Sequence, residues 1–131
     1  MALHLKIIGM LLIALGSVHV IFPKYFNWKD ELERLSLINR QVMRVHTFFI
    51  ALTVSMMGLL CLTSTQELLQ SSLGRKISLG FGIFWVCRLF IQLFGYSSQL
   101  WRGKKFETIV HLVFTLTWVY FCCVFLIIGF R

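Results

Sequence analysis

The stretch that decides the fold is residues 106–130, FETIVHLVFTLTWVYFCCVFLIIGF. Its only carboxylate is Glu107 and its only histidine is His111, while most of its other side chains are apolar. About 20 such residues in a helix span the hydrocarbon core of a bilayer. The stretch therefore predicts a transmembrane helix.

Three further apolar stretches lie at residues 5–22, 42–62 and 77–96. The chain has 131 residues, of which 58% are hydrophobic. A soluble domain of this size cannot bury so much apolar surface. We therefore expect an all-α, four-transmembrane-helix bundle that forms a single integral membrane domain over residues 1–131.

The connecting segments are short, and each suggests a local structure. We expect Pro23 to close the first span, and residues 30–35 to form a short amphipathic helix at the interface between spans one and two, with Leu32 and Leu35 toward lipid headgroups. Residues 63–76 are rich in Ser, Thr and Gln, which predicts a turn. Gly9 and Gly16 lie seven residues apart on span one, so they give that helix a small face for close packing.

The formal net charge of +8 is spread over loops and helix ends without a dense basic cluster, so we expect no nucleic-acid partner. The side of the membrane that holds the loops after spans one and three carries eight Lys and Arg residues, namely Lys24, Lys29, Arg34, Arg40, Arg44, Arg102, Lys104 and Lys105. The opposite side carries four, namely Lys6, Arg75, Lys76 and Arg131. The positive-inside rule then places those loops in the cytoplasm and both termini outside.

Each apolar stretch contains an ionisable residue, and such groups are costly in a membrane and suggest function. They are His19, His46, Arg88 and His111. Counted from the predicted helix ends at about 1.5 Å per residue, they lie about 5 to 12 Å below the same face, together with Gln92. The sequence thus predicts one polar layer that draws on all four helices.

Helical spacing supports an inward orientation for this layer. One stripe on span three contains Trp85, Arg88, Gln92 and Gly95, and one on span four contains Glu107, His111, Thr115 and Trp118. Glu107 lies one turn from His111, so it is a candidate partner of that histidine or of Arg88.

The leading interpretation is a redox role with haem b or a single transition-metal ion. Imidazoles bind such metals, and His19, His46 and His111 are the candidate ligands. Other residues are candidates for binding the cofactor without ligating its metal, for example by contacting haem propionates. They are Arg88, Gln92, Glu107, Arg40 and Arg44. The positive charge of Arg88 favours haem over a bare metal ion.

Two other functions stay open. The chain can be a non-catalytic membrane subunit that binds a lipid or quinone headgroup through Arg88, or a purely structural bundle. No motif of a soluble enzyme is present, so the sequence leaves both an enzymatic activity and catalytic residues unassigned. The expected partners are membrane lipids and an amphipathic small molecule, and a homodimer or a larger membrane complex is plausible.

Several runs carry a resemblance to known proteins: NRQVMRVH at 39–46, RLFIQ at 88–92 and WRGK at 101–104, followed by His111 and WVY at 118–120. They are similar to a group of small bacterial four-helix membrane proteins without an established activity. The resemblance covers most of the chain and implies a bacterial inner (cytoplasmic) membrane location. The outline also resembles DoxX-like membrane proteins, in topology only.

Overall fold

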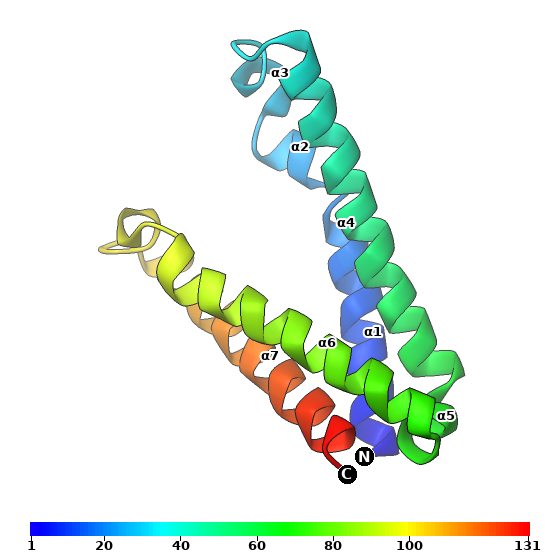
Figure 1. Cartoon of the computed structure of the whole chain (residues 1–131). Coiled ribbons are helices and arrows are strands. Elements are labelled where there is room, and N and C mark those ends of the chain that lie inside the picture. Colours follow the sequence, from blue (N-terminus) through cyan, green and yellow to red (C-terminus); the bar gives the residue numbers. More distant parts are fainter. The chain divides into compact units, whose positions relative to one another are not determined.

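The computed structural model describes residues 1–131, and it consists of helices and connecting segments without a β-strand (Figure 1). The elements are α1 (Ala2–Val18), α2 (Phe22–Tyr25), α3 (Trp28–Glu31), α4 (Leu37–Thr63), α5 (Thr65–Gln70), α6 (Ser72–Phe90), a π-helix η1 (Ile91–Gly95), a 3₁₀ helix η2 (Ser98–Leu100) and α7 (Lys105–Gly129). The expected all-α class is confirmed.

Three helices are long and apolar enough to cross a membrane. They are α4 with 27 residues, α6 continued through η1 with 24 residues, and α7 with 25 residues. Each exceeds the roughly 20 residues that a bilayer core requires. The remaining helix, α1, is apolar but has 17 residues, so it is shorter than the other three. The molecule fits a membrane protein.

Its contacts divide the chain into two compact units. One unit comprises Leu3–Thr65, and the other comprises Gln66–Arg131 together with Met1 and Ala2.

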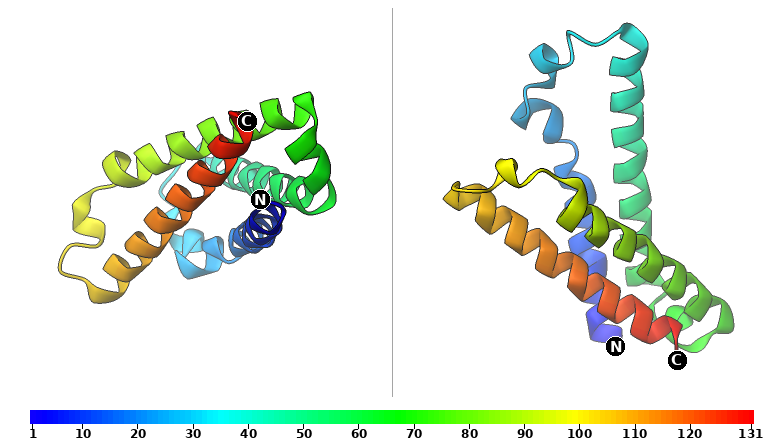
Figure 2. Two further views of the ribbon diagram at one scale, coloured as in Figure 1. Left: turned by 90° about the horizontal axis from the view of Figure 1, so that it is seen from below. Right: turned by 60° about the vertical axis from the view of Figure 1, so that its left-hand side comes forward.

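In the first unit, α1 and α4 lie side by side, as Figures 1 and 2 show. Their contact is made by small residues. A Cβ added at Gly58 would lie 2.8 Å from the carbonyl oxygen of Gly9, and one added at Gly16 would collide with the Ser55 hydroxyl. The small face predicted from Gly9 and Gly16 therefore packs closely against α4.

The predicted end of the first span at Phe22 is wrong, because α1 ends at Val18. The amide of Ile21 donates to the carbonyl of Val18 at 2.9 Å, which is the tight hydrogen bonding of a closing turn. Pro23 lies in the first turn of α2, where a proline lacks no required hydrogen bond. Hydropathy misplaced this boundary because the apolar run continues through the turn.

The predicted interfacial helix at 30–35 is also misplaced. Of this segment only Asp30 and Glu31 are helical, as the end of α3, and Asn27 between α2 and α3 lies in the left-handed region with φ 54°. Asparagine is among the few residues that tolerate this conformation. Leu32 and Leu35 follow α3 rather than sharing a helix face.

Two serine caps explain why other boundaries differ from those predicted. Ser36 accepts a hydrogen bond from the amide of Asn39, so α4 begins five residues before the predicted start at Val42. Ser71 accepts from the amide of Gly74 at 2.8 Å and starts α6. The turn predicted for residues 63–76 is therefore wrong, because α5 and the first turn of α6 occupy it.

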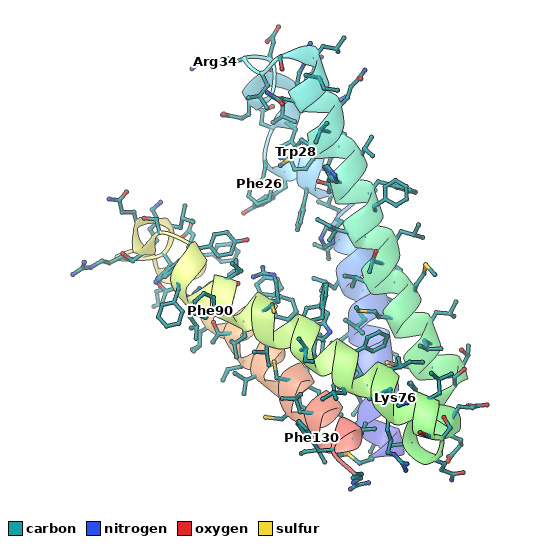
Figure 3. The ribbon with its side chains drawn as sticks, viewed as in Figure 1. Phe26, Trp28, Arg34, Lys76, Phe90 and Phe130 are labelled. Carbon is teal, nitrogen blue, oxygen red and sulfur yellow. The ribbon has the colours of Figure 1, made fainter.

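In the second unit, α6 and α7 form a hairpin and lie side by side (Figures 1 and 2). Trp85 of α6 stacks on Trp118 of α7 with ring centroids 4.9 Å apart. Near the far end, a Cβ at Gly129 would lie 2.8 Å from the backbone of Leu79, so the helices touch closely there. Figure 3 labels Phe90 near the loop end of the hairpin and Phe130 at the end of α7, and both are largely exposed.

The close packing of α1 on α4 predicts the effect of one methyl group. Gly58→Ala would place its Cβ against the backbone of α1, so we expect it to lower the free energy of unfolding by about 1–3 kcal/mol. The matched control is Gly80→Ala, whose Cβ would meet nothing within 4 Å. Since alanine favours helix, the control is expected to be neutral or stabilising by up to about 1 kcal/mol. Unfolding in detergent micelles measures both, and equal effects would contradict the packing.

Candidate functional site

A polar cluster lies at the loop end of the α6–α7 hairpin. Its centre is Gln92, a neutral amide of η1 that is only 6% exposed. Arg88 lies one turn earlier on α6, and His111 faces the amide from α7. The π-helix that carries Gln92 is a rare geometry that is often found at functional sites.

Three side chains bind the two ends of the Gln92 amide. Its Oε1 accepts a hydrogen bond from Arg88 Nη1 at 3.2 Å and one from Trp118 Nε1 at 3.4 Å. Its Nε2 lies 2.9 Å from Nδ1 of His111. One buried amide therefore joins the two helices of the hairpin.

Aromatic rings contact two members of the cluster, His111 and Arg88. The indole of Trp101, in the loop, stacks on His111 with ring centroids 3.8 Å apart and planes 8° from parallel. The guanidinium carbon of Arg88 lies 5.2 Å from the ring centroid of Trp118 and 5.6 Å from that of Tyr96. Such cation–π contacts stabilise a cation without neutralising it.

The charge of Arg88 has no carboxylate among its recorded contacts. This half-buried side chain donates to the neutral amide of Gln92 and otherwise faces aromatic rings. Glu107, which the sequence suggests as a partner of Arg88 or His111, is exposed near the start of α7. A guanidinium has five N–H donors, so most of them remain for another acceptor.

The other predicted site residues belong to the first unit. His19 follows the end of α1 and is half-buried, with Nδ1 2.8 Å from the carbonyl oxygen of Leu15 and its ring against Phe22. His46 is exposed, and because α4 begins early it lies about 2.5 turns into the helix rather than one.

Arg40 and Arg44 were expected at the loop and the helix entry, yet both lie within α4. Arg40 is half-buried and Arg44 is exposed. Within either unit, no three His, Cys, Asp or Glu side chains gather in a group that could hold a metal ion. A layer that combines His19 and His46 with His111 stays a prediction, since these residues lie in different units.

Sequence reasoning did not assign Trp101 and Tyr96 to the site. Both are aromatic residues of the segment between α6 and α7, where Tyr96 ends η1 and Trp101 follows η2. The helical periodicity of the sequence does not predict the contact between Trp101 and His111. Trp101 lies in a loop, and the path of that loop brings its indole onto the imidazole. The signal that the sequence did offer was the presence of aromatic residues in the segment between Arg88 and His111.

Comparisons with models of known protein families, with curated proteins and with solved structures found no match for this chain.

The Gln92 cluster predicts a coupled effect on stability. Gln92→Leu leaves the buried Nε1–H of Trp118 and an N–H of the half-buried Arg88 without this acceptor, so we expect a loss of about 1–3 kcal/mol in the free energy of unfolding. The control Gln99→Leu changes an exposed glutamine of η2 and is expected within about 0.5 kcal/mol of the unchanged protein.

A double-mutant cycle between Gln92→Leu and His111→Leu tests the contact directly. Contact across the hairpin implies a coupling energy of about 0.5–3 kcal/mol. Additive effects of the two substitutions would show that the amide and the imidazole do not interact.

Proposed function

We propose that this protein spans the membrane four times and binds the anionic, oxygen-bearing headgroup of an amphipathic molecule at the loop end of the α6–α7 hairpin. The observation that carries this proposal is Arg88, a half-buried cation in a membrane-length helix whose recorded contacts are a neutral amide and two aromatic rings. An uncompensated charge at this depth is costly, and a bound anion offsets that cost.

The chemistry of Arg88 suits a phosphate or a carboxylate. A guanidinium donates to two oxygens of either group through a planar pair of N–H bonds, and such charge-assisted bonds are short and strong. The headgroup of an anionic phospholipid supplies this acceptor where the hydrocarbon core meets water. A quinone offers neutral carbonyl oxygens instead, so it leaves the charge of Arg88 uncompensated.

The loop beside the site strengthens the attraction for anions. Arg102, Lys104 and Lys105 are exposed and lie next to Trp101, while Glu107 is the one carboxylate nearby in sequence. Basic residues at the ends of membrane helices bind anionic lipid headgroups. Trp101 is of the type that anchors a helix end at the membrane interface.

The four crossings are supported by the composition of α1 as well as by the three longer helices. Its length of 17 residues, most of them apolar, is at the lower limit of about 17–25 for a transmembrane helix. The excess of Lys and Arg in the loops after α1 and after η1 and in the adjoining helix ends supports a cytoplasmic location for those loops and an external location for both termini. The resemblance noted above favours a bacterial inner membrane.

This orientation predicts the behaviour of terminal reporters. Alkaline phosphatase fused after Arg131 is expected to be active, because that enzyme needs an oxidising compartment outside the cytoplasm. A reporter that is active only in the cytoplasm is expected to be silent at either terminus and active when inserted at Gly103, in the loop between η2 and α7. The reverse pattern would invert the orientation, and termini on opposite sides would contradict four crossings.

Haem b or a transition-metal ion with a redox role is our second candidate, and His19 is its specific support. Hydrogen bonding of Nδ1 to Leu15 leaves Nε2 of this imidazole free, which is how many metal-ligating histidines are held. A Soret band or a stoichiometric metal in the purified protein, lost in His19→Gln, would favour this candidate. His46 on α4 is then the ligand to test next.

The leading proposal predicts a selective loss of lipid binding. Arg88→Gln removes the cation, so we expect the apparent dissociation constant for a short-chain phosphatidylglycerol to rise roughly 10- to 150-fold, as for the loss of one charge-assisted hydrogen bond of about 1.5–3 kcal/mol. Arg75→Gln is the matched control, since Arg75 lies at the opposite end of α6. We expect it to leave the dissociation constant within about threefold of its original value, because Arg75 is also half-buried but lies several turns of helix away from the Gln92 cluster.

Titration with further ligands shows whether the oxygen atoms that bind Arg88 belong to a phosphate, a carboxylate or a quinone. Titration of the purified protein in a neutral detergent compares phosphatidylglycerol with a fatty acid, with phosphatidylcholine and with a short-chain quinone. Arg88-dependent binding of the phospholipid or the fatty acid supports the proposal and distinguishes phosphate from carboxylate. Equal binding of phosphatidylcholine, or Arg88-dependent binding of the quinone alone, would contradict it.

A further inference from the structure

The orientation of the Gln92 amide follows from its neighbours. The side chains of arginine and tryptophan carry only hydrogen-bond donors, so the end of the amide that faces Arg88 and Trp118 must be its oxygen. The opposite end, which lies 2.9 Å from His111 Nδ1, must then be the NH₂ group. Two donors from two helices thus fix an amide whose ends are otherwise alike.

The fixed amide determines the protonation of His111. Because the NH₂ group of Gln92 donates to Nδ1, that nitrogen must offer a lone pair, and the ring proton resides on Nε2. Either form with a proton on Nδ1 would place two donors opposite each other across this contact. The neutral imidazole protonated at Nε2 is the one form that satisfies the whole cluster.

We infer that Gln92 is a positioning residue that holds His111 as an N–H donor, so that the site offers donors alone and takes a ligand that accepts hydrogen bonds through oxygen. The N–H groups of Arg88 and the Nε2–H of His111 are the donors that remain. This inference rests on the proposed function for the identity of the ligand, an anionic headgroup. It disagrees with His111 as a metal ligand, since one ring nitrogen accepts from Gln92 and the other carries the proton.

His19 provides the opposite case within the same chain. Its Nδ1 lies 2.8 Å from the carbonyl oxygen of Leu15, and a carbonyl can only accept. The proton of His19 therefore resides on Nδ1, and its Nε2 carries the lone pair. The two histidines are predicted to be opposite tautomers, so each serves as the reference for the other.

Nuclear magnetic resonance of the full-length protein with ¹⁵N-labelled histidine tests the inference. Spectra are recorded in micelles without added lipid at about pH 8, above the ordinary imidazole pKa near 6.5. Protonated and lone-pair ring nitrogens have well-separated shifts, and the variants His111→Gln and His19→Gln assign the signals by their loss. We expect a proton on Nε2 of His111 and on Nδ1 of His19. A proton on Nδ1 of His111, or an even mixture of its tautomers, would overturn the inference.

Gln92→Glu tests the role of the amide. A carboxylate can only accept, so Nδ1 of His111 is expected to become protonated while the His19 signals stay in place. Gln99→Glu adds the same charge at an exposed position of η2 and is expected to change neither histidine. An unchanged His111 in Gln92→Glu would show that the amide does not set the tautomer. If this variant does not fold, the spectrum of the unaltered protein decides alone.

The two proposals fail separately. The tautomers are measured without lipid, so the expected spectrum can be found even where Arg88→Gln leaves phosphatidylglycerol binding unchanged, and the proposed ligand is then wrong. The opposite outcome is lipid binding that depends on Arg88 together with a proton on Nδ1 of His111. It would support the proposed function and show that Gln92 does not position His111.

Discussion

A chain in hydrocarbon has to satisfy its polar groups from within, because no water is available to bind them. The helices of this protein do so for their backbones, and several threonine hydroxyl groups follow the same rule, whereas the buried hydroxyl of Ser78 has no hydrogen-bond partner. Thr47, Thr53 and Thr117 each donate to the carbonyl oxygen four residues earlier in their own helix, at 2.8 Å. Such local hydrogen bonds let a polar residue face lipid without a partner from another helix.

Gln92 is the exception on which the hairpin depends. Its amide has four hydrogen-bonding positions, and a single helix offers few free groups to meet them. The structure supplies Arg88 from the same helix and both His111 and Trp118 from the neighbouring one. A polar contact of this kind between membrane helices adds modest stability, but it selects one pairing and one rotation of the two helices. The candidate site is a product of that selection, since Arg88 and His111 hold their positions through the same amide.

The sequence predicted these parts to different extents. Hydropathy located α7 within one residue at each end, because Phe106 and Phe130 adjoin charged residues that mark the limits of the apolar run. The spacing of Arg88 and Gln92 placed them on one face, and the hydrogen bond between them agrees with that spacing. Hydropathy failed at the end of α1, since the apolar residues that follow Val18 favour lipid whether or not they are helical. It also gave no sign of Trp101 on His111, because a stacked contact made by a loop has no periodicity.

The π-helix η1 makes the site depend on the number of residues as well as on their identity. A π-helix corresponds to an α-helix into which one extra residue has been inserted, and each residue of an α-helix turns the chain by about 100°. A chain that lacked one residue between Ile91 and Gly95 could keep an unbroken α-helix and the same hydropathy. It would nevertheless lack the widened turn that holds Gln92 between Arg88 on its own helix and His111 and Trp118 on α7. Among proteins of similar composition, a deletion of one residue at this point would therefore mark those that have the fold but lack this site.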